Sequence, residues 1–336
     1  MIVTSFQNAR DDDPLSMAVG VRYYSLARHA LVAGLRALGV GVGGHVLMPE
    51  YICRDLLAAV HEVGASASFY AVDKCLQPAT EPADWPRADV VVAVNYFGFE
   101  QPLAPFRHYC AMRGARLIED NAHGFLSRDI YGQWLGLRGE VGLFSLRKTF
   151  PMINGAALVV QANDVAAMLA PQKRATNALL PFSLRMRRTL RYATGSRKPE
   201  LVVAQGIRWL RKRFIGHSIV PTAIDAEMHI PGYPEPAGDL FVTLALQKFA
   251  VESERRRRLY DDILICAKAS SCQPVFPYLP EGIVPYGFPA FCDDPYTLRA
   301  ISRGFGLDCF RWPDLPDALA QHAPEHYRRL YVANFL

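Results

Sequence analysis

The feature that most constrains the fold is a regular alternation of helix-like and strand-like segments through the first 160 residues. Apolar residues at helical spacing predict helices at 26–39, 54–64 and 105–114. Short apolar runs predict strands at 45–49, 67–72, 89–98, 115–120, 143–147 and 156–160. The strand segments are apolar almost throughout, which is typical of strands covered on both faces. The alternation therefore predicts an α/β domain with a mostly parallel sheet.

The pattern changes after about residue 165. Residues 173–213 hold twelve Lys or Arg and one acidic residue, Glu200. A long helix is expected over 240–264, and short strand-like pieces with many prolines follow it. We predict a large α/β domain over residues 1–235, including a basic helical connector at about 165–235, and a small C-terminal α+β domain over 236–336. A chain of 336 residues is long enough for two domains.

Composition excludes several classes of protein. Hydrophobic residues make up 51% of the chain and charged residues 21%, which is ordinary for a globular protein. No apolar run approaches the roughly 18–20 residues that a membrane span needs. The N-terminus has neither a basic start nor a long apolar stretch, so a signal peptide is not expected. The net charge of +5 is mild, and the basic residues are not interleaved with aromatic ones, so nucleic acid is not an expected partner.

The seven cysteines are widely spaced, odd in number and contain no C-x-x-C pair. Neither a metal site nor a disulfide framework is expected, and a cytoplasmic location fits this usage best. The glycines of residues 39–44 formally match the G-x-G-x-x-G pattern of dinucleotide-binding loops. That pattern requires a strand before it and a helix after it, and here the predicted order is reversed. These glycines therefore predict a helix stop and a turn.

Two sites in the sheet could carry chemistry. The strand 115–120 ends in Glu119 and Asp120 and runs into a small polar turn that includes His123. Ligands of open parallel sheets bind outside the carboxyl ends of the strands, so Asp120 could meet one; capping a helix or facing solvent is the alternative. Lys148 directly follows one predicted core strand and precedes another. A partly buried lysine has a lowered pKa that suits covalent chemistry, whereas an exposed surface lysine is the alternative.

Together these segments resemble the DegT/DnrJ/StrS family of sugar aminotransferases, which are fold type I enzymes that use pyridoxal 5′-phosphate. The resemblance covers about residues 23–160, with weaker similarity at 240–264 and 306–316. It implies the fold type I architecture, glutamate or glutamine as amino donor and a nucleotide-linked keto-sugar as acceptor. It also implies a homodimer and a pathway such as surface polysaccharide biosynthesis.

The resemblance implies a role for each matching residue. The segment EDNAHG places Asp120 at the pyridine nitrogen of the cofactor and His123 at its 3-hydroxyl edge. Lys148 matches the lysine that bonds to the cofactor and later moves the proton of the substrate carbon. Ser145 matches the serine that binds the cofactor phosphate.

Two further matches lie in the N-terminal part of the chain. Ala27 and Arg28 occupy the place of a Gly-Thr pair at a helix N-terminus, where backbone N–H groups bind phosphate. Cys53 occupies the place of an aromatic residue that stacks on the cofactor, and Tyr51 could stack in its stead. The family also has two more residues before the lysine and an asparagine in the loop that reads HIPGYPEPAGD here. These departures indicate a divergent member.

Several readings remain open at this stage. The segment 173–213 is either a solvated helical face, a phosphate contact or a surface for a membrane or acidic partner. Arg255–Arg258 is expected to form a surface turn with salt bridges. The favoured function is a sugar aminotransferase. A lyase or dehydratase that uses the same cofactor is an alternative, although such family members tend to replace the lysine with histidine. A non-catalytic protein that binds a sugar nucleotide is the third hypothesis.

Overall fold

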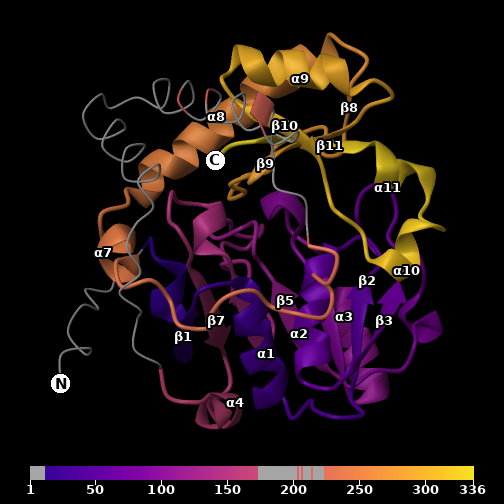
Figure 1. Ribbon diagram of the computed structural model, residues 1–336, viewed down its shortest axis with the longest axis vertical. Coiled ribbons are helices and arrows are strands. Elements are labelled where there is room, and N and C mark those ends of the chain that lie inside the picture. The colour runs from indigo at the N-terminus through magenta and orange to yellow at the C-terminus, as the bar shows by residue number, and fades with distance from the viewer. Residues whose placement is uncertain (1–11, 173–202, 204–205, 207–212, 215–222) are drawn as a thin grey trace.

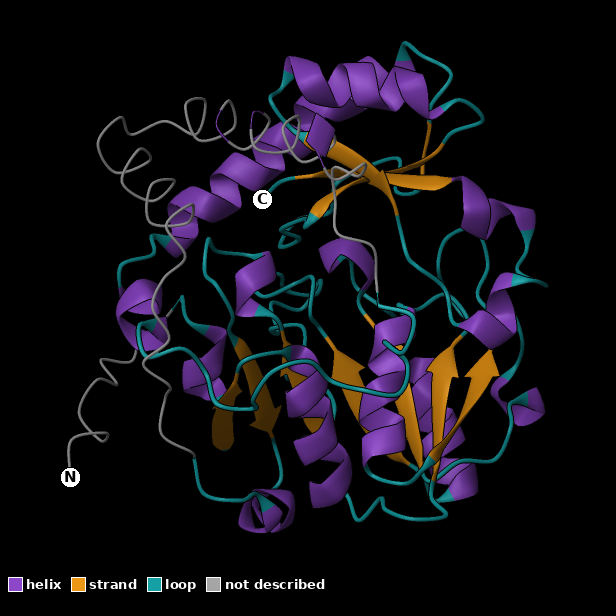
Figure 2. Ribbon diagram, in the orientation of Figure 1, coloured by secondary structure: helices purple, strands orange, loops and turns teal. Residues whose placement is uncertain are grey.

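The computed structural model describes residues 12–172, 203, 206, 213–214 and 223–336. Most of the basic segment 173–213 lies outside these residues, and so do the predictions made for it. Two β-sheets organise the described part of the chain, a large one in the N-terminal half and a small one near the C-terminus (Figures 1 and 2).

The large sheet has seven strands in the order β1-β7-β6-β5-β4-β2-β3. Strands β2 to β6 run parallel to one another, whereas β7 and β1 are antiparallel to their neighbours. The predicted, mostly parallel sheet is therefore confirmed. Its strands are β1 (Gly20–Tyr24), β2 (His45–Pro49), β3 (Ser66–Tyr70), β4 (Val90–Val94), β5 (Arg116–Asp120), β6 (Val141–Phe144) and β7 (Ala156–Val160).

Burial explains which strands the sequence revealed. Every residue of β4 and β7 is buried, and these strands read as continuous apolar runs. Strand β1 lies at the sheet edge, has only half-buried residues and includes Arg22, so its sequence carried no such signal. The strand predicted at 143–147 is displaced toward the C-terminus. The observed strand β6 covers Val141–Phe144, and Leu146–Lys148 forms the 3₁₀ turn η5.

Helix α1 packs so closely on the large sheet that glycine is needed at the contact. A Cβ atom on Gly34 would lie 3.1 Å from Leu158 Cδ1 of β7 and 3.2 Å from Val141 Cγ1 of β6. The helix ends at Gly39, whose φ of +79° is the left-handed conformation typical of a helix C-terminus. The predicted helix stop is thus confirmed. The helices of this half are α1 (Ala27–Ala37), α2 (Leu57–Glu62), α3 (Ala104–Arg113) and α4 (Asn163–Met168).

The small sheet is antiparallel, with the order β10-β11-β9-β8, and it lies over the edge of the large sheet at which the parallel strands end (Figures 1 and 2). Its strands are β8 (Gln273–Pro274), β9 (Gly287–Phe291), β10 (Asp308–Arg311) and β11 (Leu330–Asn334). Helices α8 (Phe249–Lys268) and α9 (Pro295–Gly304) contact it, and α10 (Asp317–Ala320) and α11 (Glu325–Arg329) connect its last strands. This arrangement fits the predicted α+β character, and the boundary at residue 235/236 stays a prediction.

The long helix predicted over 240–264 is divided in two. Helix α7 covers Leu240–Ala245, and α8 begins at Phe249. The Gln247 side chain donates a hydrogen bond to the Thr243 carbonyl at 2.7 Å, which satisfies a backbone acceptor at the end of α7. Among the described helices, none is both long enough and apolar enough to cross a membrane.

Candidate active site

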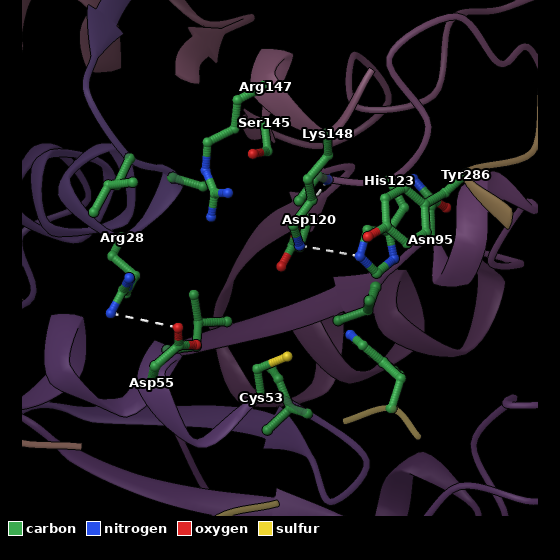
Figure 3. Close-up of a pocket in the computed structure, with 17 residues that line it drawn as sticks. Arg28, Cys53, Asp55, Asn95, Asp120, His123, Ser145, Arg147, Lys148 and Tyr286 are labelled. Carbon is green, nitrogen blue, oxygen red and sulfur yellow. Dashed lines mark hydrogen bonds and ion pairs between the residues drawn. The ribbon is translucent and has the colours of Figure 1, made fainter. Parts of the chain in front are cut away.

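A cavity of about 200 Å³ lies where β4, β5 and β6 end beneath the small sheet (Figure 3). The large sheet supplies most of its wall, and the C-terminal part of the chain supplies Tyr286 and Trp312. All seven residues predicted for the site line this one cavity, namely Ala27, Arg28, Cys53, Asp120, His123, Ser145 and Lys148. The roles assigned to them remain predictions.

Asp120 is the last residue of β5, and its carboxylate lies at the cavity wall. One oxygen, Oδ1, accepts a hydrogen bond from the Ala122 N–H at 2.9 Å, which fixes the side chain. Burial raises the pKa of Asp120, while the Ala122 N–H and the nearby Lys148 lower it. The second carboxylate oxygen is left to meet a ligand.

The hydrogen bonds of His123 define its protonation state. The Phe97 N–H donates to His123 Nδ1 at 3.2 Å, so a neutral ring carries its proton on Nε2. Burial lowers the pKa of His123 well below 6.5, and Lys148 whenever its amine is protonated, together with the Arg256 cation, lowers it further, so the ring is neutral near pH 7. Nε2 lies 3.0 Å from Lys148 Nζ (Figure 3). The ring N–H therefore donates to the lysine, which accepts only as an unprotonated amine.

Lys148 has the environment that such an amine requires. Burial lowers its pKa from 10.5; Cys53 opposes this shift, Arg147 adds to it, and Asp120 opposes it. The residue closes the η5 turn directly after β6, which brings Nζ over the ends of β5 and β6. A neutral amine beside a carboxylate can form a covalent bond with a carbonyl group and can exchange protons.

Aromatic rings hold the His123 imidazole in place. Tyr286 stacks on it with ring centroids 4.4 Å apart, and Phe97 lies nearly parallel to it at 5.6 Å. Trp312 meets its edge at 5.3 Å. No sequence pattern pointed to Tyr286. Trp312 lies in the segment 306–316, which resembles the family's C-terminal substrate-side segment, although a single tryptophan is more often a packing residue. Both rings reach the site through the packing of the small sheet.

Groups that can bind an anion lie on the side of the cavity away from His123. Ala27 and Arg28 open α1, and Ser145 directly follows β6 within the same wall. The Arg28 guanidinium lies 3.4 Å from the Asp55 carboxylate and so has a counter-ion within the protein. Arg147 also lines the cavity and was not predicted. Its place beside Lys148 in the sequence was the available signal.

Cys53 lines the cavity, but Tyr51 does not. Burial raises the pKa of the Cys53 thiol to about 12, so it is a neutral side chain. Tyr51 is fully buried elsewhere, with its hydroxyl donating to the Trp312 carbonyl and its ring against Tyr96 and Tyr327. The suggestion that Tyr51 stacks on a ligand in place of Cys53 is therefore wrong.

Arg256 corrects the expectation that Arg255–Arg258 forms a surface turn. Its side chain is 1% exposed and pairs with Glu252 at 2.8 Å. It also donates to the backbone carbonyls of Lys148 at 3.2 Å and Thr149 at 2.9 Å, and to that of Pro285 at 3.1 Å. One buried guanidinium from α8 thus ties the lysine-bearing turn to the chain that leads into β9.

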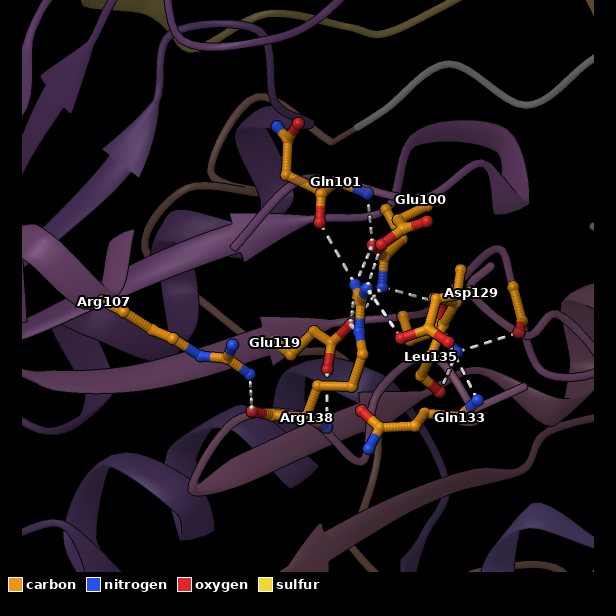
Figure 4. A network of polar contacts seen from close by, with 11 residues as sticks. Glu100, Gln101, Arg107, Glu119, Asp129, Gln133, Leu135 and Arg138 are labelled. Carbon is orange, nitrogen blue, oxygen red and sulfur yellow. Dashed lines mark hydrogen bonds and ion pairs between the residues drawn. The ribbon is translucent and has the colours of Figure 1, made fainter. Parts of the chain in front are cut away.

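A network of polar side chains centres on Arg138 (Figure 4). Arg138 is 4% exposed and contacts the buried Glu119 carboxylate at 2.6 Å, Glu100 at 2.7 Å and Asp129 at 3.7 Å. Glu119 also accepts from Asn95 Nδ2 at 2.8 Å. Because Glu119 precedes Asp120 in β5, its ion pair fixes the strand end that carries Asp120. Asn95 lines the cavity, but its amide serves this network.

The fold and the cavity define an α/β protein with a lysine and a carboxylate at adjoining strand ends of a mostly parallel sheet. Residues 23–175 match the sequence model of the DegT/DnrJ/EryC1/StrS aminotransferase family. The resemblance predicted from the sequence is therefore confirmed for this part of the chain.

Two curated relatives are similar to the same region. A UDP-N-acetyl-3-dehydro-alpha-D-glucosamine 3-aminotransferase of Acidithiobacillus ferrooxidans is 34% identical over 133 residues, which are 38% of this chain and 35% of that protein. An L-glutamine:scyllo-inosose aminotransferase of Streptomyces griseus is 32% identical over 143 residues, 41% of this chain and 34% of that protein. The matched region thus spans about a third of the length of these relatives.

Solved structures share the whole fold. An aminotransferase of the same family from Brucella abortus has a TM-score of 0.61 at 18% identity, covering 94% of this chain and 81% of that one. DesI, solved in the presence of its TDP-sugar product, has a TM-score of 0.63 at 17% identity, covering 95% and 76%. The predicted fold class, with both the large and the small domain, is confirmed.

Proposed function

We propose that this protein is an aminotransferase that uses pyridoxal phosphate to transfer an amino group from glutamate or glutamine to a nucleotide-linked keto-sugar. The observation that carries the proposal is the 3.0 Å contact between Lys148 Nζ and His123 Nε2 in the cavity that Asp120 also lines. The family match over residues 23–175 supports it.

The residues of the cavity fit this cofactor. Lys148 offers an amine for its aldehyde, and Asp120 offers a carboxylate for its ring nitrogen. The buried hydroxyl of Ser145 and the start of α1 offer hydrogen-bond donors for its phosphate. When bound, pyridoxal phosphate supplies the aldehyde and the electron-withdrawing ring that amino transfer needs.

Each residue then has a defined task. Asp120 holds a proton at the ring nitrogen through its free carboxylate oxygen. Lys148 Nζ, once released by the amino donor, takes the proton from the amine-bearing carbon and later returns a proton to the acceptor carbon. His123 keeps the amine neutral and in place through its Nε2–H. The donor leaves as a keto acid, and the same cavity then receives the keto-sugar, so ping-pong kinetics are expected.

The names of the relatives support the acceptor class. The Acidithiobacillus relative is named for a UDP-linked keto-sugar and the Streptomyces griseus relative for a keto-cyclitol. Both acceptors offer a ring ketone flanked by hydroxyl or amide groups. Rates with a UDP-linked keto-sugar and with scyllo-inosose, each with glutamate and with glutamine, would separate the two. A higher kcat/KM for the free cyclitol would overturn the nucleotide-linked assignment.

The decisive test is spectroscopic. The wild type with added pyridoxal phosphate should show an absorption band that borohydride alters by fixing the cofactor covalently, and peptide mapping should find it on Lys148. The Lys148→Ala variant should fix none. The Lys268→Ala variant, changed at an exposed position on α8, should behave as the wild type. A wild type without the band would leave a non-catalytic binding protein as the better description.

Asp120→Asn tests the same proposal from the other end of the cavity. The amide cannot hold the ring nitrogen in its protonated form, so we expect amino transfer to fall by about 100-fold or more. Covalent fixation on Lys148 should persist, because the lysine is intact. Equal activity of this variant and the wild type would contradict the role given to Asp120.

Three finer statements are part of the proposal. The protein is a homodimer, which sedimentation of the cofactor-loaded chain would test against a monomer. It acts in the cytoplasm, as its cysteine usage suggests. Its amino-sugar product serves a pathway such as polysaccharide biosynthesis.

A further inference from the structure

The Arg147 guanidinium is a cation in the cavity without a counter-ion. Among the residues that the structure describes, it forms no hydrogen bond or ion pair, and its Nε is buried without a partner. The other two basic side chains of the cavity are engaged, the Arg28 guanidinium by Asp55 and the Lys148 amine by His123. An arginine stays charged at any ordinary pH, so a partly buried one favours an anion beside it.

Further unsatisfied donors lie on the same wall. Ser145 is 1% exposed, lines the cavity and makes no side-chain hydrogen bond within the described chain. The N–H groups of Ala27 and Arg28 belong to the first turn of α1, where the helix leaves them without intrahelical acceptors. Figure 3 shows the Arg147 side chain pointing away from His123, toward the side of the cavity on which Arg28 lies.

The short η5 turn explains this geometry. Successive residues of a 3₁₀ turn point about 120° apart, so Arg147 and Lys148 address different parts of one cavity. Lys148 contacts His123, and Arg147 points toward the side of the cavity on which Arg28 lies (Figure 3). The Arg147 N–H donates to the Gly155 carbonyl at 3.2 Å, and the Gly155 N–H donates to the Ser25 carbonyl at 2.8 Å. These bonds join the turn to the segment just before α1.

We propose that Arg147 binds the phosphate group of the cofactor, together with Ser145 and the N-terminal N–H groups of α1. The inference rests on the proposed function. In pyridoxal phosphate the aldehyde and the phosphate arm are attached to neighbouring ring carbons, and the protein presents Lys148 and Arg147 as neighbouring residues. A guanidinium suits a phosphate because it can donate two parallel hydrogen bonds.

The test compares ligands with and without the phosphate. Dissociation constants for pyridoxal phosphate and for pyridoxal would be measured by absorption titration of the wild type, Arg147→Gln and Arg147→Lys. We expect Arg147→Gln to weaken pyridoxal phosphate binding by about 10- to 100-fold, the range for a charge-assisted hydrogen bond, and to leave pyridoxal binding unchanged. Arg147→Lys should recover part of the loss. Arg36→Gln, a surface change on α1, is the control.

Two results would overturn the proposal. An equal loss for both ligands would mean that Arg147 acts on the fold. An unchanged affinity for pyridoxal phosphate, with a raised KM for glutamate, would mean that Arg147 binds the carboxylate of the amino donor.

A second readout keeps this test separate from the proposed function. Inorganic phosphate should raise the melting temperature of the cofactor-free wild type and should do so much less in Arg147→Gln. If the wild type failed to fix the cofactor on Lys148 but kept this response to phosphate, the result would support the anion site and reject the aminotransferase function. If phosphate had the same effect on both proteins, the anion site would fall.

Discussion

At the residue scale, the chemistry of the cavity depends on one unprotonated lysine. Burial lowers the pKa of Lys148 from 10.5, so more of its amine is unprotonated at a given pH than in the unfolded chain. We expect an amine-reactive reagent to label Lys148 with a lower pH midpoint in the folded, cofactor-free protein than in the urea-unfolded protein, as measured by mass spectrometry. His123→Asn removes the ring N–H donor and the aromatic cover, so it should alter the midpoint of the folded protein. Identical labelling profiles of Lys148 in the two states would contradict the lowered pKa.

The sequence was sufficient to identify most residues of this site but not the side chains that pack around them. Asp120 and Lys148 were found because they lie at the ends of apolar strands, and strand ends meet at one edge of a parallel sheet. Ser145 was found through the resemblance to the family. Tyr286 and Arg256 could not be found in either way. They come from the C-terminal part of the chain, and no local pattern records which of its side chains contact a site built on the large sheet.

At the element scale, helix α8 controls the position of the lysine through Arg256. Removal of this buried cation leaves the Glu252 carboxylate with Arg255 as its remaining arginine partner and takes the Arg256 donors from the Lys148 and Thr149 carbonyls. We expect Arg256→Met to lower the free energy of unfolding by about 3–5 kcal/mol in urea titrations. Arg258→Met on the same helix removes an exposed ion pair and should cost about 0–1 kcal/mol. A similar decrease in the free energy of unfolding for both variants would show that the buried contacts of Arg256 do not stabilise the fold.

The turn between η5 and β7 depends on a glycine. Gly155 has a φ of +147°, and an added Cβ would lie 2.8 Å from Leu240 Cδ1. We expect Gly155→Ala to lower the free energy of unfolding by about 1–3 kcal/mol, mainly through backbone strain. Gly41→Ala, at a position with an ordinary φ and nothing within 4 Å of the added atom, is the control and should change little. An equal effect at the two positions would argue against strain at Gly155.

The sequence marked most elements but not all their ends. Helix stops at glycine and fully buried strands have strong local signals, as α1 and β4 show. The edge strand β1 and the division between α7 and α8 have weak ones. Their ends depend on a neighbouring strand and on a side-chain hydrogen bond from Gln247, respectively.

At the scale of the whole molecule, the buried His123 links stability to pH. Its pKa lies well below 6.5 in the folded protein, whereas the unfolded chain binds a proton near that pH. The unfolded state therefore takes up more protons as the pH falls, and the free energy of unfolding decreases below about pH 6.5. Between pH 7 and 5.5, one such histidine accounts for about 1 kcal/mol.

Urea unfolding at the two pH values would measure this contribution. His123→Asn should lose about 1 kcal/mol less than the wild type over the interval, whatever its stability at pH 7. His322→Asn, changed at an exposed position, controls for the loss of a histidine. A pH dependence that is the same in His123→Asn and the wild type would contradict the buried neutral imidazole.

The last strand of the small sheet has a consequence for synthesis. β11 covers Leu330–Asn334 and lies between β10 and β9, with Phe335 fully buried beyond it. A ribosome must therefore translate past residue 335, and the nascent chain must clear the exit tunnel, before this sheet can close and bring Trp312 firmly over the cavity. A message cut before codon 330 would yield a chain that has every predicted cofactor residue but lacks the strand that joins β10 to β9.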